Sequence, residues 1–153
     1  MLAKLSKNSC NSCTEWGLLG LRLILGIILI VHGFPKLFGD TAGLLAFFES
    51  TVLPAPNLLL ILAGVIELVG GVAIVLGYKT RYFSWLVVFE FTVIILFVKL
   101  AKGFSAMELD LLILANAYAL SAMGSGKYSL ERLLSKRKEK GTGPGHSSEA
   151  MGG

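Results

Sequence analysis

Residues 17–34 read GLLGLRLILGIILIVHGF, an apolar stretch interrupted by one arginine and one histidine. A helix needs about 20 residues, within a range of about 17–25, to cross the hydrocarbon core of a bilayer. Three further stretches meet this requirement, at residues 58–77, 82–101 and 107–124, and the last is the least hydrophobic. None of the four alternates with the period of two expected for a barrel strand. The sequence therefore predicts an all-α membrane protein, folded as a four-transmembrane-helix bundle.

The composition of the whole chain supports a membrane protein. Of 153 residues, 54% are hydrophobic and only 16% are charged, and the mean hydropathy is +0.73. Soluble domains carry about 25% charged residues. The composition excludes a disordered chain and a nucleic-acid-binding protein that works through a basic surface, and it argues against a water-soluble enzyme. The length predicts a single transmembrane domain, residues 17–124.

The segments that join the spans are short, except for one. Residues 78–81 and 102–106 predict tight turns, so spans two and three form an antiparallel hairpin. The longest loop covers residues 35–57. Its apolar middle, residues 41–53, predicts a short interfacial helix.

The two ends of the chain are polar. We expect residues 1–16 to be a cytoplasmic leader that is not cleaved, because the apolar stretch behind them lacks a small-residue cleavage site. Residues 125–153 predict a basic and largely disordered tail, rich in glycine and serine at its end. Within this tail, Ser129 can cap a short amphipathic helix at residues 130–134.

Positive charges predict the orientation of the bundle. Ten lysines and arginines lie in the leader, the second loop and the tail, whereas three lie in the first and third loops. Loops rich in lysine and arginine stay on the cytoplasmic side. We therefore expect a multi-pass protein of the cell membrane with both termini in the cytoplasm and a basic tail attracted to anionic lipid.

Four charged residues of the predicted spans lie where lipid makes a charge costly, and His32 accompanies them. They are Arg22, Glu67, Glu90 and Asp110. Each costs about 2.5–3.5 kcal/mol on insertion scales, and such residues usually mark ligand or proton pathways. A structural alternative is that Arg22 pairs with a glutamate and only specifies helix packing. For the whole set, the sequence favours a functional pocket.

Helical periodicity assigns these residues to faces. In span one, a stripe of polar and small residues lies within about 40° at 100° per residue, with His32 about 80° to one side. In span two, small residues surround Glu67. In span three, Lys99 is expected opposite Glu90, where it can snorkel to the headgroups. The residues expected to line the pocket are Arg22, His32, Lys36, Glu67, Gly71, Phe83, Glu90, Phe97 and Asp110.

Cys10 and Cys13 precede the first span with the spacing of a reactive dithiol or of half a metal site. A thioredoxin-type motif needs a βαβ context, which is absent, and a four-ligand zinc site needs more ligands nearby. Two incidental thiols in a flexible leader are the simpler interpretation. No metal or flavin ligand set is visible in the sequence.

Three motifs resemble the DoxX family of membrane proteins. Residues 22–39 (RLILG, then VHGFPKLFG) resemble the family's first span, residues 63–71 (AGVIELVGG) resemble its second-span motif, and residues 126–130 (GKYSL) resemble its ending after span four. The resemblance implies a four-helix bundle. It also implies oxidoreductase assemblies, including the membrane subunit of thiosulfate:quinone oxidoreductase. Arg22, His32, Lys36 and Glu67 match the family motif, whereas Glu90 departs from it.

These observations lead to one main hypothesis and two alternatives. The main hypothesis is a quinone-binding oxidoreductase subunit of the thiosulfate:quinone type, with Glu67, Glu90 and His32 as catalytic groups. A second oxidoreductase subunit and a homo-oligomer are the partners considered besides lipid; nucleic acid is not expected. The alternatives are a non-catalytic scaffold for a redox complex, and a thiol–disulfide oxidoreductase that uses Cys10 and Cys13.

Overall fold

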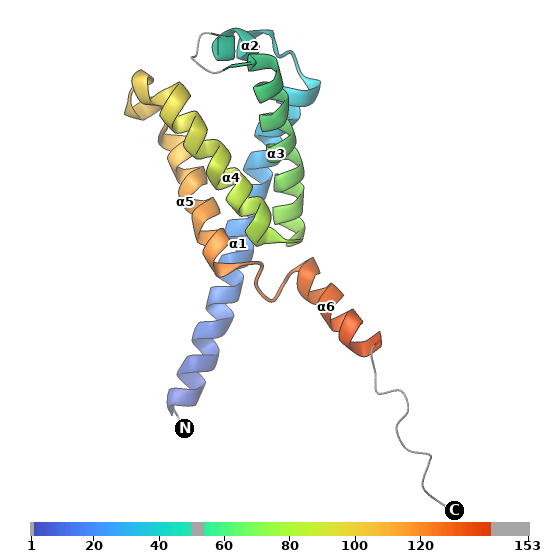
Figure 1. The fold of residues 1–153 in the computed structure, drawn as a ribbon. Coiled ribbons are helices and arrows are strands. Elements are labelled where there is room, and N and C mark those ends of the chain that lie inside the picture. Colours follow the sequence, from blue (N-terminus) through green and yellow to red (C-terminus); the bar gives the residue numbers. More distant parts are fainter. Residues whose placement is uncertain (1, 50–53, 142–153) are drawn as a thin grey trace, which may run out of the picture.

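A computed structural model describes residues 2–49 and 54–141. These residues form helices and short connections, without a strand in the part of the chain that is described, which confirms the all-α class. Figure 1 shows four long helices running side by side, α1, α3, α4 and α5. The short helix α2 (Ala42–Glu49) lies at one end and α6 (Leu130–Gly141) projects from the other.

The first helix is longer than predicted. α1 (Leu2–Phe38) has 37 residues and includes both the leader, which was expected to be a separate polar segment, and Pro35, which was placed in the loop. Its length is about 55 Å at 1.5 Å per residue, well above the thickness of hydrocarbon. Pro35 lies in the last turn, so its missing N–H removes a hydrogen bond only near the end of the helix, and its carbonyl accepts from Gly39 N–H (2.9 Å).

The predicted hairpin of spans two and three is confirmed. α3 (Pro56–Leu76) ends at Gly77, whose φ of 70° lies in the left-handed region that favours glycine. Gly77 N–H donates to Ile74 O (3.1 Å) and Tyr78 N–H donates to Ala73 O (2.9 Å). These hydrogen bonds satisfy carbonyl groups at the end of α3. The chain then turns and continues as α4 (Thr80–Ile94).

The third predicted span is not a uniform α-helix. After α4 the chain forms a π-helical turn, η1 (Ile95–Lys99), and then two 3₁₀ turns, η2 (Leu100–Lys102) and η3 (Phe104–Ala106). A π-turn is wider than an α-turn, so the residues beyond it rotate less far around the axis. α5 (Glu108–Met123) then returns along α4.

Two helix pairs make up the bundle. α1 packs mainly on α3 and α4 mainly on α5. A core of apolar side chains from all four helices joins the pairs, and it includes Leu25, Leu29, Ile74, Val87, Phe91, Ala117 and Leu120.

Glycines let the backbones of α1 and α3 approach closely. A Cβ added at Gly26 would lie 2.7 Å from the carbonyl oxygen of Gly71, and one added at Gly71 would lie 2.8 Å from the carbonyl oxygen of Gly26. A Cβ added at Gly33 or at Gly64 would also come too close to the facing helix. Each of these glycines lies about two helical turns from Gly26 or Gly71. The small-residue face of span two is therefore a helix contact of the kind common in membranes.

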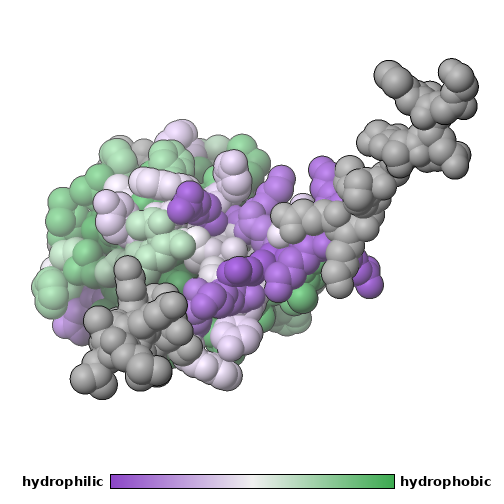
Figure 2. Space-filling view, turned by 90° about the horizontal axis from the view of Figure 1, so that it is seen from below, coloured by the Kyte–Doolittle hydropathy of each residue, from purple (hydrophilic) through white to green (hydrophobic). Residues whose placement is uncertain are grey.

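The outer surface is apolar. Within the described residues, three helical segments are long and apolar enough to cross a membrane, namely Cys13–Phe38, Pro56–Leu76 and Thr80–Lys99. α5 spans about 24 Å at 1.5 Å per residue, and its crossing of the bilayer stays a prediction. Figure 2, seen from below, shows hydrophilic side chains gathered at the α6 end and apolar ones around the sides. We call this the basic end; its cations include Lys79, Arg81, Lys127 and Arg132.

The helix predicted in the tail is present and longer than expected. Ser129 Oγ accepts a hydrogen bond from Arg132 N–H (3.4 Å), as expected of a cap, and α6 continues to Gly141 rather than ending at residue 134. Likewise α2 confirms a helix in the first loop. Residues 50–53 of that loop prediction and residues 142–153 of the tail lie outside the described residues.

Candidate functional site

A cavity of about 260 Å³ lies between the four long helices, toward the end that carries α2. Five ionisable side chains line it: His32, Lys36, Glu67, Lys99 and Asp110. Apolar side chains, among them Phe91, Ile94 and Ile113, form the rest of its wall. The structure thus brings together four of the nine residues expected in the pocket, together with Lys99, which was expected near the outer end of its span.

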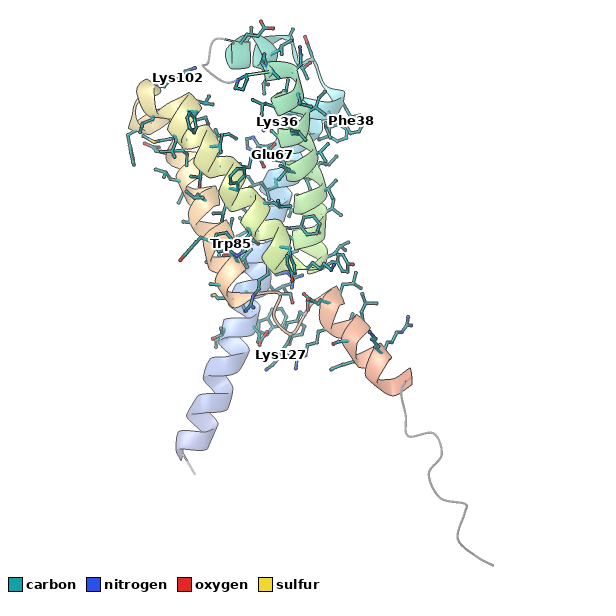
Figure 3. All side chains as sticks on the ribbon, viewed as in Figure 1. Lys36, Phe38, Glu67, Trp85, Lys102 and Lys127 are labelled. Carbon is teal, nitrogen blue, oxygen red and sulfur yellow. The ribbon has the colours of Figure 1, made fainter. Side chains whose placement is uncertain are left out.

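The first ion pair joins α1 to α3. Lys36 Nζ lies 2.6 Å from Glu67 Oε2, and the Glu67 side chain is only 2% exposed. Figure 3 shows the two side chains meeting in the upper half of the bundle. A Cβ at Gly33 would lie 2.9 Å from the Cβ of Glu67, and one at Gly64 would lie 3.0 Å from the Cβ of Lys36. The two glycines therefore bring the helices close enough for this ion pair.

The second ion pair joins η1 to α5. Lys99 Nζ lies 2.5 Å from Asp110 Oδ2, and the Asp110 side chain is 8% exposed. The expected position of Lys99, opposite Glu90 and snorkelling, is therefore wrong. The π-turn explains the difference, because the wider turn rotates Lys99 toward the cavity. The opposite charges of Lys99 and Asp110 on either side of a short turn were the signal that sequence reasoning missed.

His32 lies at the margin of this site. Its side chain is exposed and lines the cavity, on the same helix as Lys36 and one turn before it. The cavity thus holds three side chains that can carry positive charge and two carboxyl groups. Such a set can bind a small anion, or a neutral headgroup that needs both donors and acceptors.

Arg22 lies at the basic end, away from this cavity. Its Nε donates to Ile74 O (3.0 Å) and its Nη2 donates to Val75 O (2.9 Å), at the last turn of α3. Its Nη1 donates to Ser125 O (2.7 Å) and Tyr128 O (2.8 Å). The expected place of Arg22 in the pocket and the alternative, an ion pair with a glutamate, are therefore both wrong. The guanidinium instead joins three segments of the chain through backbone carbonyls.

Glu90 lies outside the cavity as well. Its side chain is buried, and among the described residues neither carboxylate oxygen has a hydrogen-bond partner. It lines a separate groove of about 150 Å³ between α3 and α4.

The aromatic slot expected from Phe83 and Phe97 is not formed. Phe97 lies in η1 and is 61% exposed, and Phe83 packs against the core. Gly71 lies in the α1–α3 contact rather than in a cavity. Phe91, which the sequence did not single out, supplies the aromatic wall instead.

The cysteine motif is part of helix α1 rather than of a flexible leader. Cys13 is exposed, and the side chain of Cys10 lies outside the described side chains. Over the described residues, no three His, Cys, Asp or Glu side chains converge in a way that could hold a metal ion.

Apolar helices of spanning length around a charged cavity define a multi-pass membrane protein. The DoxX family model matches residues 17–100, more than half of the chain, and the chain belongs to the DoxX family. "Putative oxidoreductase CatD" of Bacillus subtilis is 39% identical over 86% of this chain and 96% of its own length. "Inner membrane protein YqjF" of Escherichia coli is 32% identical over 79% of this chain and 94% of its own. No solved structure matches the chain.

Proposed function

We propose that this protein is a quinone-binding membrane oxidoreductase subunit whose site is the cavity between the two ion pairs. The observation that carries the proposal is the composition of that cavity, in which two lysine–carboxyl pairs face an apolar wall. The oxidoreductase named among the relatives supports the reaction class.

The residues that line the cavity fit a quinone headgroup. A quinone needs an apolar surface for its ring, donors for its two carbonyl oxygens and, on reduction, two protons. Phe91 and Ile113 offer the apolar surface, and Lys36 and Lys99 offer the donors from opposite helix pairs. When bound, a quinone supplies the ability to accept two electrons.

The ion pairs hold protons where they are needed. Lys36 Nζ donates to Glu67 Oε2 (2.6 Å) at the cavity wall, and Lys99 and Asp110 form a second ion pair that lines the same cavity. His32, exposed at the margin, is suited to resupply them from outside. A thiosulfate dianion as electron donor would be attracted by His32, Lys36 and Lys99, consistent with the thiosulfate:quinone type.

Replacing Glu67 by glutamine tests this proposal. We expect Glu67→Gln to lower quinone reduction by about 100-fold, because it removes one ionisable partner of the proton-bearing pair. The measurement is quinone reduction by protein purified in native lipid, together with extraction of bound quinone. The matched control is Glu108→Gln, since Glu108 is exposed at the start of α5 and does not line the cavity.

The outcomes separate the two function classes. Wild-type turnover in Glu67→Gln removes Glu67 from the mechanism. A wild-type protein that neither co-purifies with quinone nor binds it is not an oxidoreductase of this type.

One observation favours a second candidate, a non-catalytic scaffold. α6 projects from the bundle and exposes Leu133 and Leu134 beside a run of basic residues (Figure 1). Such a helix can dock on a partner or an anionic membrane surface. Deleting residues 130–153 leaves the Arg22 contacts to Ser125 and Tyr128 in place. Loss of co-purifying proteins on this deletion, in a protein that binds no quinone, would support the scaffold.

We further propose that the basic end faces the cytoplasm and that the protein resides in the cell membrane, as the name of the E. coli relative indicates for that protein. Because Cys13 is exposed near this end, a Cys10→Ser variant should react with a membrane-impermeant maleimide in inside-out vesicles and not in intact cells. Labelling in intact cells alone would reverse the orientation.

A further inference from the structure

An apolar groove between α3 and α4 opens on the outside of the bundle. Leu59, Leu62 and Ile66 line it from α3, and Phe89 and Val93 line it from α4. Leu62 and Phe89 are well exposed, so these walls face the lipid. The groove is therefore accessible to molecules dissolved in the bilayer rather than to solutes in water.

Of the described residues that line this groove, Glu90 alone is ionisable. Its side chain is 7% exposed, and within the described part of the chain both carboxylate oxygens lack a hydrogen-bond partner. A buried polar group without a partner costs free energy, so packing alone does not account for a glutamate at this position. A carboxyl group can accept from a hydroxyl or, when protonated, donate to a carbonyl.

The groove and the cavity adjoin at Ile94. This side chain lines both of them. It is the last residue of α4, directly before the π-turn that carries Lys99 toward the cavity. Irregular turns of this kind occur frequently at functional sites. Ile94 therefore lies at the boundary between the lipid-facing groove and the charged cavity.

We infer that the groove is a lateral entrance, through which a lipid-dissolved quinone reaches the cavity while its apolar tail stays between α3 and α4. Ile94 is the partition that must rotate, and Glu90 is the polar contact for the headgroup on the way. This inference rests on the proposed function, because it assigns the route to the same cavity.

The first experiment changes the size of the partition. Ile94→Trp should slow the association of a long-tailed quinone about tenfold in lipid nanodiscs, and Ile94→Ala should not slow it. Because Ile94 also lines the cavity, the readout is the ratio of the association rates of two quinones: a short-tailed, water-soluble quinone need not pass through the lipid, so Ile94→Trp should slow it clearly less than the long-tailed one. Leu86→Trp is the matched control, because Leu86 is exposed on α4 and does not line the groove.

The second experiment tests access to Glu90 without any quinone. A lipid-soluble carbodiimide adds to carboxyl groups that it reaches from the membrane, and mass spectrometry locates the adduct. We expect modification of Glu90 in wild-type protein in bilayers, none at this position in Glu90→Gln, and little with a water-soluble carbodiimide. Protection by the long-tailed quinone would place the tail in the groove.

The results distinguish this inference from the proposed function. If wild-type protein binds no quinone, the proposed function fails, and this route fails with it. If quinone binds but Glu90 is unreactive, or Ile94→Trp slows both quinones equally, the lateral entrance alone is overturned.

Discussion

An Arg22→Ala variant should lose roughly 4 kcal/mol of stability, because the four carbonyl oxygens that Arg22 binds would lose a charged donor in a buried place. Those carbonyls belong to the last turn of α3 and to the segment after α5 (residues 125–128). Loss of the guanidinium therefore disconnects both segments from α1. For a chain of this length, such a loss lowers the melting temperature by about 10 °C.

Thermal unfolding of the purified protein at fixed detergent concentration, followed by circular dichroism, measures this effect. Arg22→Lys should be intermediate, because a lysine has a compact charge and does not reproduce the planar fork of donors. Arg81→Ala is the matched control, since Arg81 makes one exposed hydrogen bond, to Ala122 O (3.2 Å). Equal melting temperatures for Arg22→Ala and Arg81→Ala would show that the carbonyl contacts contribute little.

Adjacent glycines of α3 should respond oppositely to the same change. Gly71→Ala should destabilise the protein by about 2–3 kcal/mol, because the added methyl group meets the backbone of Gly26 and Ile30 at 2.8–3.1 Å. Backbone atoms of a packed helix cannot rotate away. Gly70→Ala places its methyl group 3.8 Å from Phe83 and Val87, an ordinary contact, and should be neutral or stabilising by up to about 1 kcal/mol through helix propensity.

The same unfolding measurement compares the two variants. Gly20→Ala on α1 is a second control, because nothing lies within 4 Å of the added atom. If Gly71→Ala melts at the same temperature as Gly70→Ala, the helices can separate at little cost. In that case the close approach of α1 and α3 would not be needed for the fold.

Hydrophobic length and charge predicted most of the architecture. Apolar stretches separated by turns specified the helix order, and the hairpin at Gly77 followed from a short polar connection. Periodicity also placed Lys36 and Glu67 on inward faces, because both lie in regular helix beside small residues. The sequence pattern could not predict where α1 begins and ends, because the polar leader and Pro35 are compatible with either helix or loop.

The errors about the site have two physical causes. A regular repeat of 3.6 residues per turn cannot anticipate a π-turn, so Lys99 and Phe97 were each assigned to the wrong side of their helix. Arg22 was expected to line the pocket, or in the alternative to pair with a glutamate, because only side chains are visible in a sequence. Its actual partners are backbone carbonyls, which every residue has and no motif marks.

The distribution of the two ion pairs has a consequence for motion. Lys36 and Glu67 both belong to the α1–α3 pair, whereas Lys99 and Asp110 both belong to the half formed by α4, its π-turn and α5. Among the described residues, no lysine–carboxyl contact of the cavity joins one half to the other. A shift of one half relative to the other would therefore leave both ion pairs intact.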